Sequence, residues 1–453
     1  MQQHERLFET LPPTRLFLRC ALPSMVSMAV TSLYVVADGV FVGRFVGAGA
    51  LAAVNLVMPL IMISFALSDM VAVGSSVQIA IHLGEKKGLE ASRIFSVCSA
   101  LILGISCAVG LGGLLLAEPL LRLMGADAGV TALAAEYLKV YAAFSPAIMI
   151  FFAVDNYLRI CGKVRYSMGL NVVISLLNIA LDFFFLAVWR LGVGSAALAS
   201  CLSLSLGTVL GFLPFLRGRL PLRFVRGKIP PALLGNILAN GSSEFFSSTA
   251  SSVMMVILNS VLLRLAGSTA VAAFSIVLYV DSVVGSLLYG LADSMQPAIS
   301  YCYGARLRGR MFSLEKRVLL VSAAISLLTM SWMLWGGRGV VALFVPGGDQ
   351  ALLDMSLRAM GIFSLSYLSG WVGTGLSAFF TAVDRPGLSL GLALCRSLGF
   401  PLLSLAVLPR FWGLDGVWLT PVAGGALTAL LAAALLLGVL RRDRREPPIA
   451  AAG

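Results

Sequence analysis

Twelve apolar stretches divide this sequence from near its first residue to near its last. A helix needs about 20 consecutive apolar residues to cross the hydrocarbon core of a bilayer, and each stretch is long enough. No polar stretch between them could form a soluble domain, so most of the chain must be surrounded by lipid. The stretches are residues 16–43, 51–81, 94–117, 133–160, 166–189, 193–216, 233–264, 271–303, 317–345, 356–382, 388–409 and 414–440.

Composition agrees with this interpretation. Only 12% of the residues are charged and 59% are hydrophobic, whereas charged residues make up about 25% of a typical globular domain. No stretch alternates apolar and polar residues as the strands of a membrane β-barrel do. We therefore predict an all-α polytopic membrane protein with twelve transmembrane helices.

Lysine and arginine lie mostly on one side of the predicted membrane. The N-terminal segment, the alternate loops and the C-terminal tail hold 24 of the 33 basic residues. Because short basic loops stay in the cytoplasm, we expect a multi-pass inner-membrane protein with both termini cytoplasmic. These loops lack interleaved aromatic residues, so the net charge of +12 indicates topology and not nucleic-acid binding.

An internal repeat divides the chain into two halves of six helices. An offset of 220 residues aligns residues 47–57 with residues 267–277, and it also aligns Gly84 with Gly304. Parallel repeats related by a two-fold axis along the membrane normal are typical of transporters, whose site lies near mid-membrane between the halves. The predicted segments are a cytoplasmic start (1–15), an N-lobe (16–216), a linker (217–232), a C-lobe (233–440) and a basic cytoplasmic tail (441–453).

Missing sequence motifs limit the possible energy sources and cofactors. No Walker A pattern occurs, so an ion gradient or a partner protein must drive any transport. The 7 cysteines are scattered singly, and there are only 2 histidines, which excludes a zinc site or a disulfide framework as the organising feature. We expect no cofactor besides a coupling ion.

Acidic side chains inside the apolar stretches are the strongest functional signal. An ionised residue at the centre of a membrane helix costs about 2.5–3.5 kcal/mol on insertion scales, so each one requires a reason. Seven acids meet this description: Asp38, Asp69, Asp155, Asp182, Glu244, Asp281 and Asp293.

Asp38 and Asp182 form the first candidate site. Both come late in outward-going helices, so both belong to the outer half of the membrane, and Asn178 precedes Asp182 by one helical turn. Two carboxylates and an amide oxygen could share a proton or a small cation. They could instead form ordinary interhelical hydrogen bonds, worth about 0.6 kcal/mol each. Further polar residues on the same two helix faces are Ser27, Thr31 and Tyr34 on the first helix and Asn171 on the fifth.

A second polar cluster is expected nearer the cytoplasm. Asp155 and Arg159 are one turn apart on the fourth helix, Arg396 lies at a similar depth on the eleventh, and Glu244 and Asp293 fall in the same region. An ion-pair network that closes the inner gate and a second transport site fit this pattern equally well.

Several stretches resemble the multidrug and toxic compound extrusion (MATE) family. These are "LPSMVSMAVTSLYVVADGVFVGRFVGAGALAAVNL" (22–56), "DNYLRICGKVRYSMGLNVVISLLNIALDFFF" (155–185), "LGVGSAALAS" (191–200) and "GLADSMQPAISYCYGA" (290–305). The likeness covers nearly the whole chain and is strongest to the MepA-like branch.

The resemblance implies secondary active antiport, in which cationic amphiphilic drugs leave in exchange for H⁺ or Na⁺ by alternating access. It also implies a monomer without enzymatic activity. A DinF-like N-lobe ion site would consist of Asp38, Asn178, Asp182 and Ser200, and Pro23 would be the residue that bends the first helix. The sequence departs from the NorM pattern because its tenth helix carries no carboxylate.

Two other functions remain open from the sequence. A flippase for lipid-linked precursors would commonly carry two more helices and a cationic cavity. An integral membrane prenyltransferase would need a third acid one turn after Asp182, where Leu186 stands, and a second Asp-rich motif.

Overall fold

The computed structural model describes residues 6–123, 128–218, 220–345 and 349–445. Within these ranges the chain is helical and contains no strand, as predicted. Eleven of its helices are long and apolar enough to cross a membrane. One of them, α8, is 74 residues long and bends at its middle, so it supplies two spans and the predicted number of twelve is confirmed.

The first half of the chain supplies six spans. The short helix η1 (Arg6–Thr10) precedes them. They are α2 (Pro13–Phe41) continued by η2 (Val42–Val46), α3 (Ala48–Gly84), α4 (Gly88–Leu123), α5 (Ala128–Ile160), α6 (Val164–Asp182) continued by η3 (Phe183–Val188), and α7 (Val193–Leu216).

The second half supplies the other six. They are the two arms of α8 (Pro231–Gly304), then α9 (Arg308–Phe344), then α10 (Gln350–Ser364) with η5 (Leu365–Leu368) and α11 (Gly370–Ala382), then α12 (Pro386–Leu394) with η6 (Cys395–Gly399) and α13 (Phe400–Trp418), and finally α14 (Thr420–Arg445).

Glycine determines where two of these helices turn. Gly267 has a φ of 72°, which lets α8 reverse between its arms. Gly413 has a φ of 52° within α13. Residues 414–418 therefore belong to the end of α13, and the predicted last span (414–440) starts too early. The apolar span of α14 runs from Thr420 to Arg441, so its predicted end differs by one residue.

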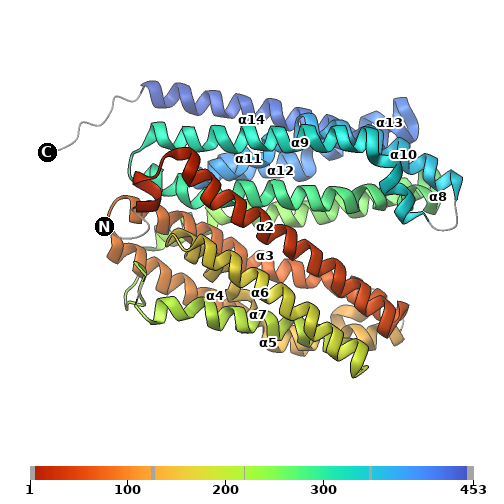
Figure 1. The fold of residues 1–453 in the computed structure, drawn as a ribbon, viewed down its shortest axis with the longest axis horizontal. Coiled ribbons are helices and arrows are strands. Elements are labelled where there is room, and N and C mark those ends of the chain that lie inside the picture. The colour runs from red at the N-terminus through yellow and green to blue at the C-terminus, as the bar shows by residue number, and fades with distance from the viewer. Residues whose placement is uncertain (1–5, 124–127, 219, 346–348, 446–453) are drawn as a thin grey trace.

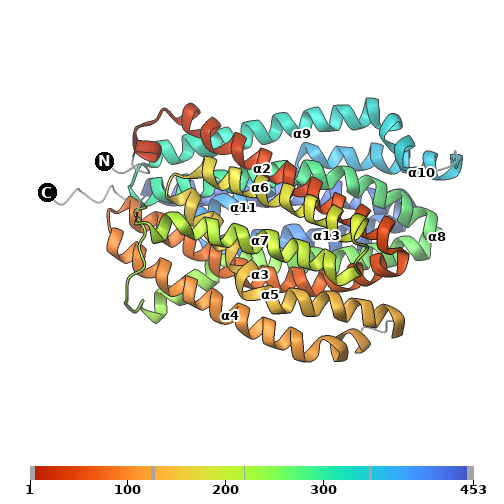
Figure 2. The same ribbon diagram turned by 60° about the horizontal axis from the view of Figure 1, so that its bottom comes forward.

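The helices form two groups, which we call the N-lobe (α2–α7) and the C-lobe (α8–α14). In Figure 1 the N-lobe lies below and the C-lobe above, and α2 runs along their boundary. Both ends of the described chain lie at the left of that view, where the lysine- and arginine-rich loops are also found, and we call this the basic end. Figure 2 shows α4 and α9 at opposite margins of the bundle.

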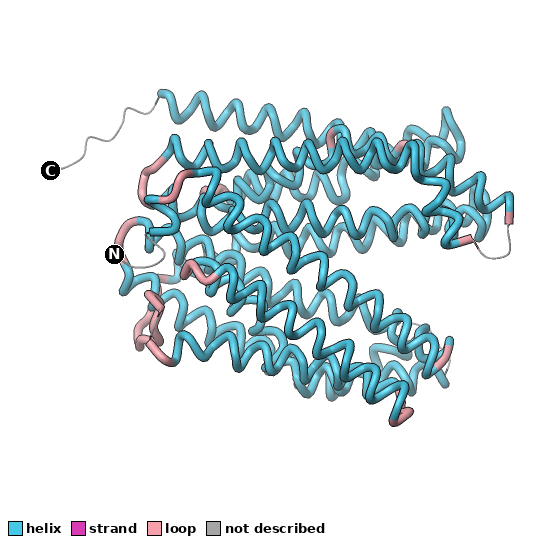
Figure 3. The backbone as a smooth tube through the Cα atoms, in the orientation of Figure 1, coloured by secondary structure: helices cyan, strands magenta, loops and turns pink. Residues whose placement is uncertain are grey.

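The lobes separate toward the end opposite the basic end, which we call the far end. The tube in Figure 3 shows the two helix groups converging at the left and diverging at the right. Contacts between α3 and α8 explain the convergence. A Cβ atom added at Gly241 would lie 1.7 Å from the carbonyl oxygen of Met70, and one at Gly74 would lie 1.9 Å from that of Ile237. Only glycine permits backbones to approach so closely.

A second pair of glycines makes a reciprocal contact at the basic end. A Cβ atom at Gly84 would lie 2.3 Å from the carbonyl oxygen of Tyr301, and one at Gly304 would lie 2.1 Å from that of Ile81. The 220-residue offset aligns Gly84 with Gly304 and Ile81 with Tyr301. The two halves of the chain thus use equivalent residues to pack against each other.

Candidate functional site

Three helices of the N-lobe bring together the four residues of the predicted ion site. Asp38 comes from α2, Asn178 and Asp182 from α6, and Ser200 from α7. Asp182 ends α6 where the wider π-type turns of η3 begin, and Asp38 lies one turn before η2. Such local widening of a helix is frequent at functional sites, because it turns side chains away from their regular positions.

The amide of Asn178 links α6 to α7. With its oxygen facing Ser200, this oxygen accepts hydrogen bonds from the Ser200 hydroxyl at 2.9 Å and from the Ser200 backbone N–H at 3.2 Å. The amide nitrogen then donates to Asp182 Oδ2 at 3.1 Å. Asn178 therefore holds one carboxylate oxygen of Asp182 in a set position and leaves the other oxygen unbonded.

The carboxyl groups of Asp38 and Asp182 interact directly with each other. Asp38 is 7% exposed and Asp182 is 0% exposed. The Oδ1 atom of each is buried without a hydrogen-bond partner, and among the described residues neither acid has a basic side chain within 4.0 Å. Two buried carboxylates repel one another unless a proton or a cation lies between them.

Tyrosines that the sequence analysis did not single out complete the wall of this site. Tyr141 of α5 interacts with Ser200, and Tyr137, one turn earlier, packs against it with the rings tilted by 30° and their centroids 5.3 Å apart. The Tyr137 hydroxyl is buried without a hydrogen-bond partner. The spacing of four residues in "EYLKVY" (136–141) was the available signal, because it puts both rings on one helix face.

The further polar residues predicted on the faces of the first and fifth helices lie in two different places. Tyr34 lies beside Asp38 and Asp182, Ser27 is buried and Thr31 is half-buried on α2. Asn171 is not part of this site, because its amide nitrogen donates to Asp155 Oδ1 at 2.9 Å. Asn171 precedes Asp182 by eleven residues, which span about 16 Å along a helix, so Asn171 lies too far toward the basic end to reach Asp182.

The second predicted cluster forms an ion-pair network between the lobes. Arg159 donates to Asp155 Oδ2 at 2.6 Å on its own helix, α5, and it also pairs with Asp293 on α8. The Ser167 hydroxyl donates to Asp155 Oδ1 at 2.5 Å. Arg159 is 5% exposed, and removing one partner from such a buried pair leaves an uncompensated charge.

Glu244 and Arg396 do not join this network. Glu244 accepts a hydrogen bond from the Tyr289 hydroxyl at 2.7 Å. Arg396 donates to Ser247 at 3.0 Å and to Thr374 at 3.2 Å, and among the described residues it has no carboxylate within 4.0 Å. Neither makes an ion pair or hydrogen bond with Asp155, but Glu244 lies near enough to Asp293 and Arg396 to interact with their charges, so their membership of one inner cluster stays a prediction. Depth along the membrane can be inferred from sequence, but lateral position within a bundle cannot.

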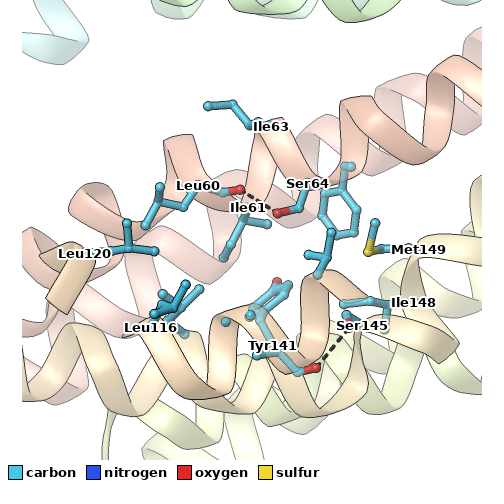
Figure 4. Close-up of a pocket in the computed structure, with 16 residues that line it drawn as sticks. Leu60, Ile61, Ile63, Ser64, Leu116, Leu120, Tyr141, Ser145, Ile148 and Met149 are labelled. Carbon is cyan, nitrogen blue, oxygen red and sulfur yellow. Dashed lines mark hydrogen bonds between the residues drawn. The ribbon is translucent and has the colours of Figure 1, made fainter. Parts of the chain in front are cut away.

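An apolar pocket adjoins the carboxylate site. It has a volume of about 300 Å³ and lies among α3, α4 and α5. Figure 4 shows Leu60 and Ile61 facing Leu116 across it, with Tyr141 at its floor and Met149 at one end. Tyr141 borders both this pocket and the carboxylate site. An apolar body and a charged group of one molecule could therefore be held side by side.

Metal binding of the transition-metal type has no support in the described part of the chain. No three His, Cys, Asp or Glu side chains gather there as a metal ligand set. The free Oδ1 atoms of Asp38 and Asp182 instead supply oxygen ligands, which suit a proton or a hard cation such as Na⁺.

Comparisons with known proteins agree with the fold. A family model described as MatE matches residues 23–184 and 245–404. The multidrug export protein MepA of Staphylococcus aureus (strain NCTC 8325 / PS 47) is 25% identical over 443 residues, which cover 96% of both chains.

Solved structures of MATE transporters have the same fold as this chain. A crystal structure of a MATE protein in complex with MaL6 superposes with a TM-score of 0.91 at 25% identity, covering 98% of this chain and 99% of that one. An outward-facing multidrug resistance MATE transporter of the MOP superfamily superposes with a TM-score of 0.88 at 25% identity, covering 98% of both chains.

Proposed function

The chain belongs to the MatE family, and from this premise we propose that it is a multidrug efflux transporter that exports cationic amphiphilic compounds in exchange for H⁺ or Na⁺. Its similarity to MepA and to the MATE structures supports the drug-export function. The proposed protein acts as a monomer in the inner membrane, with the basic end in the cytoplasm. It couples transport to an ion gradient and catalyses no covalent chemistry.

The observation that carries the proposal is the buried pair of acids in the N-lobe. Asp38 and Asp182 interact, and each keeps one carboxylate oxygen without a hydrogen bond. A site of this kind binds a proton, a small cation or the cationic group of a drug, and binding of one excludes the others. Exchange at a shared site is the simplest physical basis of antiport.

The arrangement of the lobes supports an outward-facing state. Close helix contacts and the Arg159–Asp293 pair join the lobes toward the basic end, and the helix groups diverge toward the far end (Figure 3). In the proposed cycle an ion from outside binds Asp38 and Asp182, α2 bends at Pro23, and the drug leaves. Release of the ion inside restores the negative site for the next cationic drug.

The adjoining apolar pocket accounts for the amphiphilic class of substrate. Leucine, isoleucine and methionine side chains line it, and Tyr141 connects it with the acids. One charge that moves down about 100 mV releases roughly 2.3 kcal/mol. If one H⁺ exchanges for one monovalent drug cation, this electrical contribution cancels, and the concentration gradient of the ion alone drives export.

Transport of ethidium in proteoliposomes with imposed pH or Na⁺ gradients tests the proposal. We expect one gradient to drive dye transport by the wild type, and Asp38→Asn and Asp182→Asn to abolish it while both variants stay folded. Asp354→Asn is the matched control, because Asp354 is an exposed acid near the start of α10, away from the carboxylate site. Normal transport by both N-lobe variants would show that these acids are structural, and absence of wild-type transport would refute drug efflux.

A further inference from the structure

The C-lobe contains its own cavity, separate from the carboxylate site of the N-lobe. It has a volume of about 370 Å³ and is bordered by both arms of α8 and by α10, η5, α11, η6, α13 and α14. Its apolar wall includes Met254, Phe274 and Phe363, and its polar wall includes Arg396 and Asp281. A space of this size accepts a drug-sized aromatic group.

The guanidinium of Arg396 forms no ion pair with a carboxylate of the described residues. Its guanidinium donates to two neutral hydroxyl groups, those of Ser247 and Thr374. Its Nε atom is buried with no hydrogen-bond partner, and no carboxylate of the described chain lies within 4.0 Å. A guanidinium inside a membrane protein is normally paired with an acid, so this one is short of a negative partner.

Two acids in this region, Glu244 and Asp281, make hydrogen bonds to tyrosines. Glu244 acts on Arg396 only over a longer distance, and its Oε2 accepts from the Tyr289 hydroxyl. Asp281 accepts a hydrogen bond from the Tyr367 hydroxyl at 2.7 Å. Arg396 therefore has guanidinium hydrogens left for an incoming ligand, while Asp281 places a negative charge on the same cavity wall.

We infer that the C-lobe cavity is a second ligand site, in which Arg396 binds the anionic group of an amphiphile whose apolar part packs against Met254, Phe274 and Phe363. Guanidinium is the side chain best suited to a carboxylate or phosphate, because it offers parallel N–H donors in a planar fork. The inference goes beyond the proposed function, since it assigns to the C-lobe a ligand charge opposite to that expected for the N-lobe.

Equilibrium binding of 4-(1-pyrenyl)butyrate to the full-length protein in phosphatidylcholine nanodiscs tests this site. Trp418 stacks on Phe274 with ring centroids 5.6 Å apart. Because the chain has 6 tryptophans, the part of the tryptophan-to-pyrene energy transfer that Trp418→Phe removes reports a ligand in the cavity. Empty nanodiscs measure partition of the probe into lipid. The uncharged 4-(1-pyrenyl)butanol has the same apolar body and isolates the contribution of the charge.

We expect saturable binding of the butyrate, weakened roughly tenfold or more by Arg396→Gln and partly restored by Arg396→Lys. Asp281→Asn should strengthen binding, because it removes a negative charge beside the ligand, an effect that a purely structural role for Arg396 would not produce. The matched control is Arg264→Gln, which removes an exposed arginine from the same lobe. If Arg396→Gln does not fold, Ser251→Phe fills the cavity from an exposed position without adding a tryptophan and should block binding.

Equal affinity for the butyrate and the butanol, or an unchanged affinity in Arg396→Gln, overturns the inference. Displacement of the probe by phosphatidylglycerol added to the nanodiscs would support it and identify a lipid headgroup as the source of the anion. Absence of displacement, with charge-selective binding, would support a soluble carboxylate. The assay uses no ion gradient, so its failure is distinct from failure of drug export.

Discussion

Replacing Gly241 with alanine is expected to separate the lobes at the basic end. The added Cβ atom would lie 1.7 Å from the carbonyl oxygen of Met70, and this contact must lengthen to about 3.0 Å before it resembles any real Cβ contact. The neighbour is backbone and not a flexible side chain, so relief requires α3 and α8 to move apart. The substitution should therefore disfavour the state described here.

The size of the effect follows from the cost of overpacking. Forcing a methyl group into a tightly packed interface costs typically about 1–3 kcal/mol, which corresponds to roughly a 5- to 150-fold change in the ratio of two conformations. A glycine-to-alanine change also stabilises a helix by about 0.5–1 kcal/mol. Gly235→Ala is the matched control, because it lies on the same helix arm and its Cβ would meet nothing within 4 Å.

Electron–electron distance measurements in nanodiscs can detect the shift. Spin labels attached through Glu85→Cys and Arg308→Cys, in a background without the native cysteines, report the separation of two exposed positions beside α3 and α8. We expect a longer or bimodal distance distribution for Gly241→Ala and the wild-type distribution for Gly235→Ala. Identical distributions and identical melting temperatures for the two variants would refute the argument that this close approach holds the lobes together.

Three further substitutions test other parts of the structure. Arg159→Met leaves Asp155 and Asp293 unpaired, so we expect a loss of about 3–5 kcal/mol of stability, measured by thermal unfolding in detergent, whereas the double variant with Asp293→Asn should recover part of it. A single variant as stable as the wild type would contradict a structural role for this network. Pro23→Ala restores a backbone donor inside α2 and should slow gradient-driven ethidium transport without weakening dye binding; unchanged transport would count against a bend there. Ser200→Ala removes one hydrogen bond to Asn178, and we expect it to raise the ion concentration needed for half-maximal transport several-fold, far less than the effect of Asp182→Asn.

Much of the fold could be predicted because the bilayer imposes strict rules on sequence. Backbone groups in lipid must be hydrogen-bonded within a helix, so each apolar stretch had one available structure. The ends of a helix could not be predicted where a glycine changes the chain direction, as at Gly413 in α13. Proline and glycine inside apolar stretches signal such places but do not say which way the chain turns.

Part of the candidate site could also be predicted. Asp38 and Asp182 stand out because inserting an ionised acid into the membrane costs free energy. The helical repeat places Asn178 beside Asp182. The likeness to the MATE family added Ser200. Tyr137 and Tyr141 were missed because aromatic residues are ordinary in membrane helices, and nothing local distinguishes those that face a site.

The sequence alone was enough to predict which residues lie in the membrane, that these residues are helical, and which of them are polar enough to require a reason. These properties follow from transfer free energies, which depend on each residue and its immediate neighbours. The tertiary structure adds that Arg159 meets Asp293 across the lobes, that Asn171 belongs with Asp155, and that Arg396 has no carboxylate of the described residues within 4.0 Å. Those relations depend on how the helices rotate and approach one another, and close backbone contacts at a few glycines set that approach.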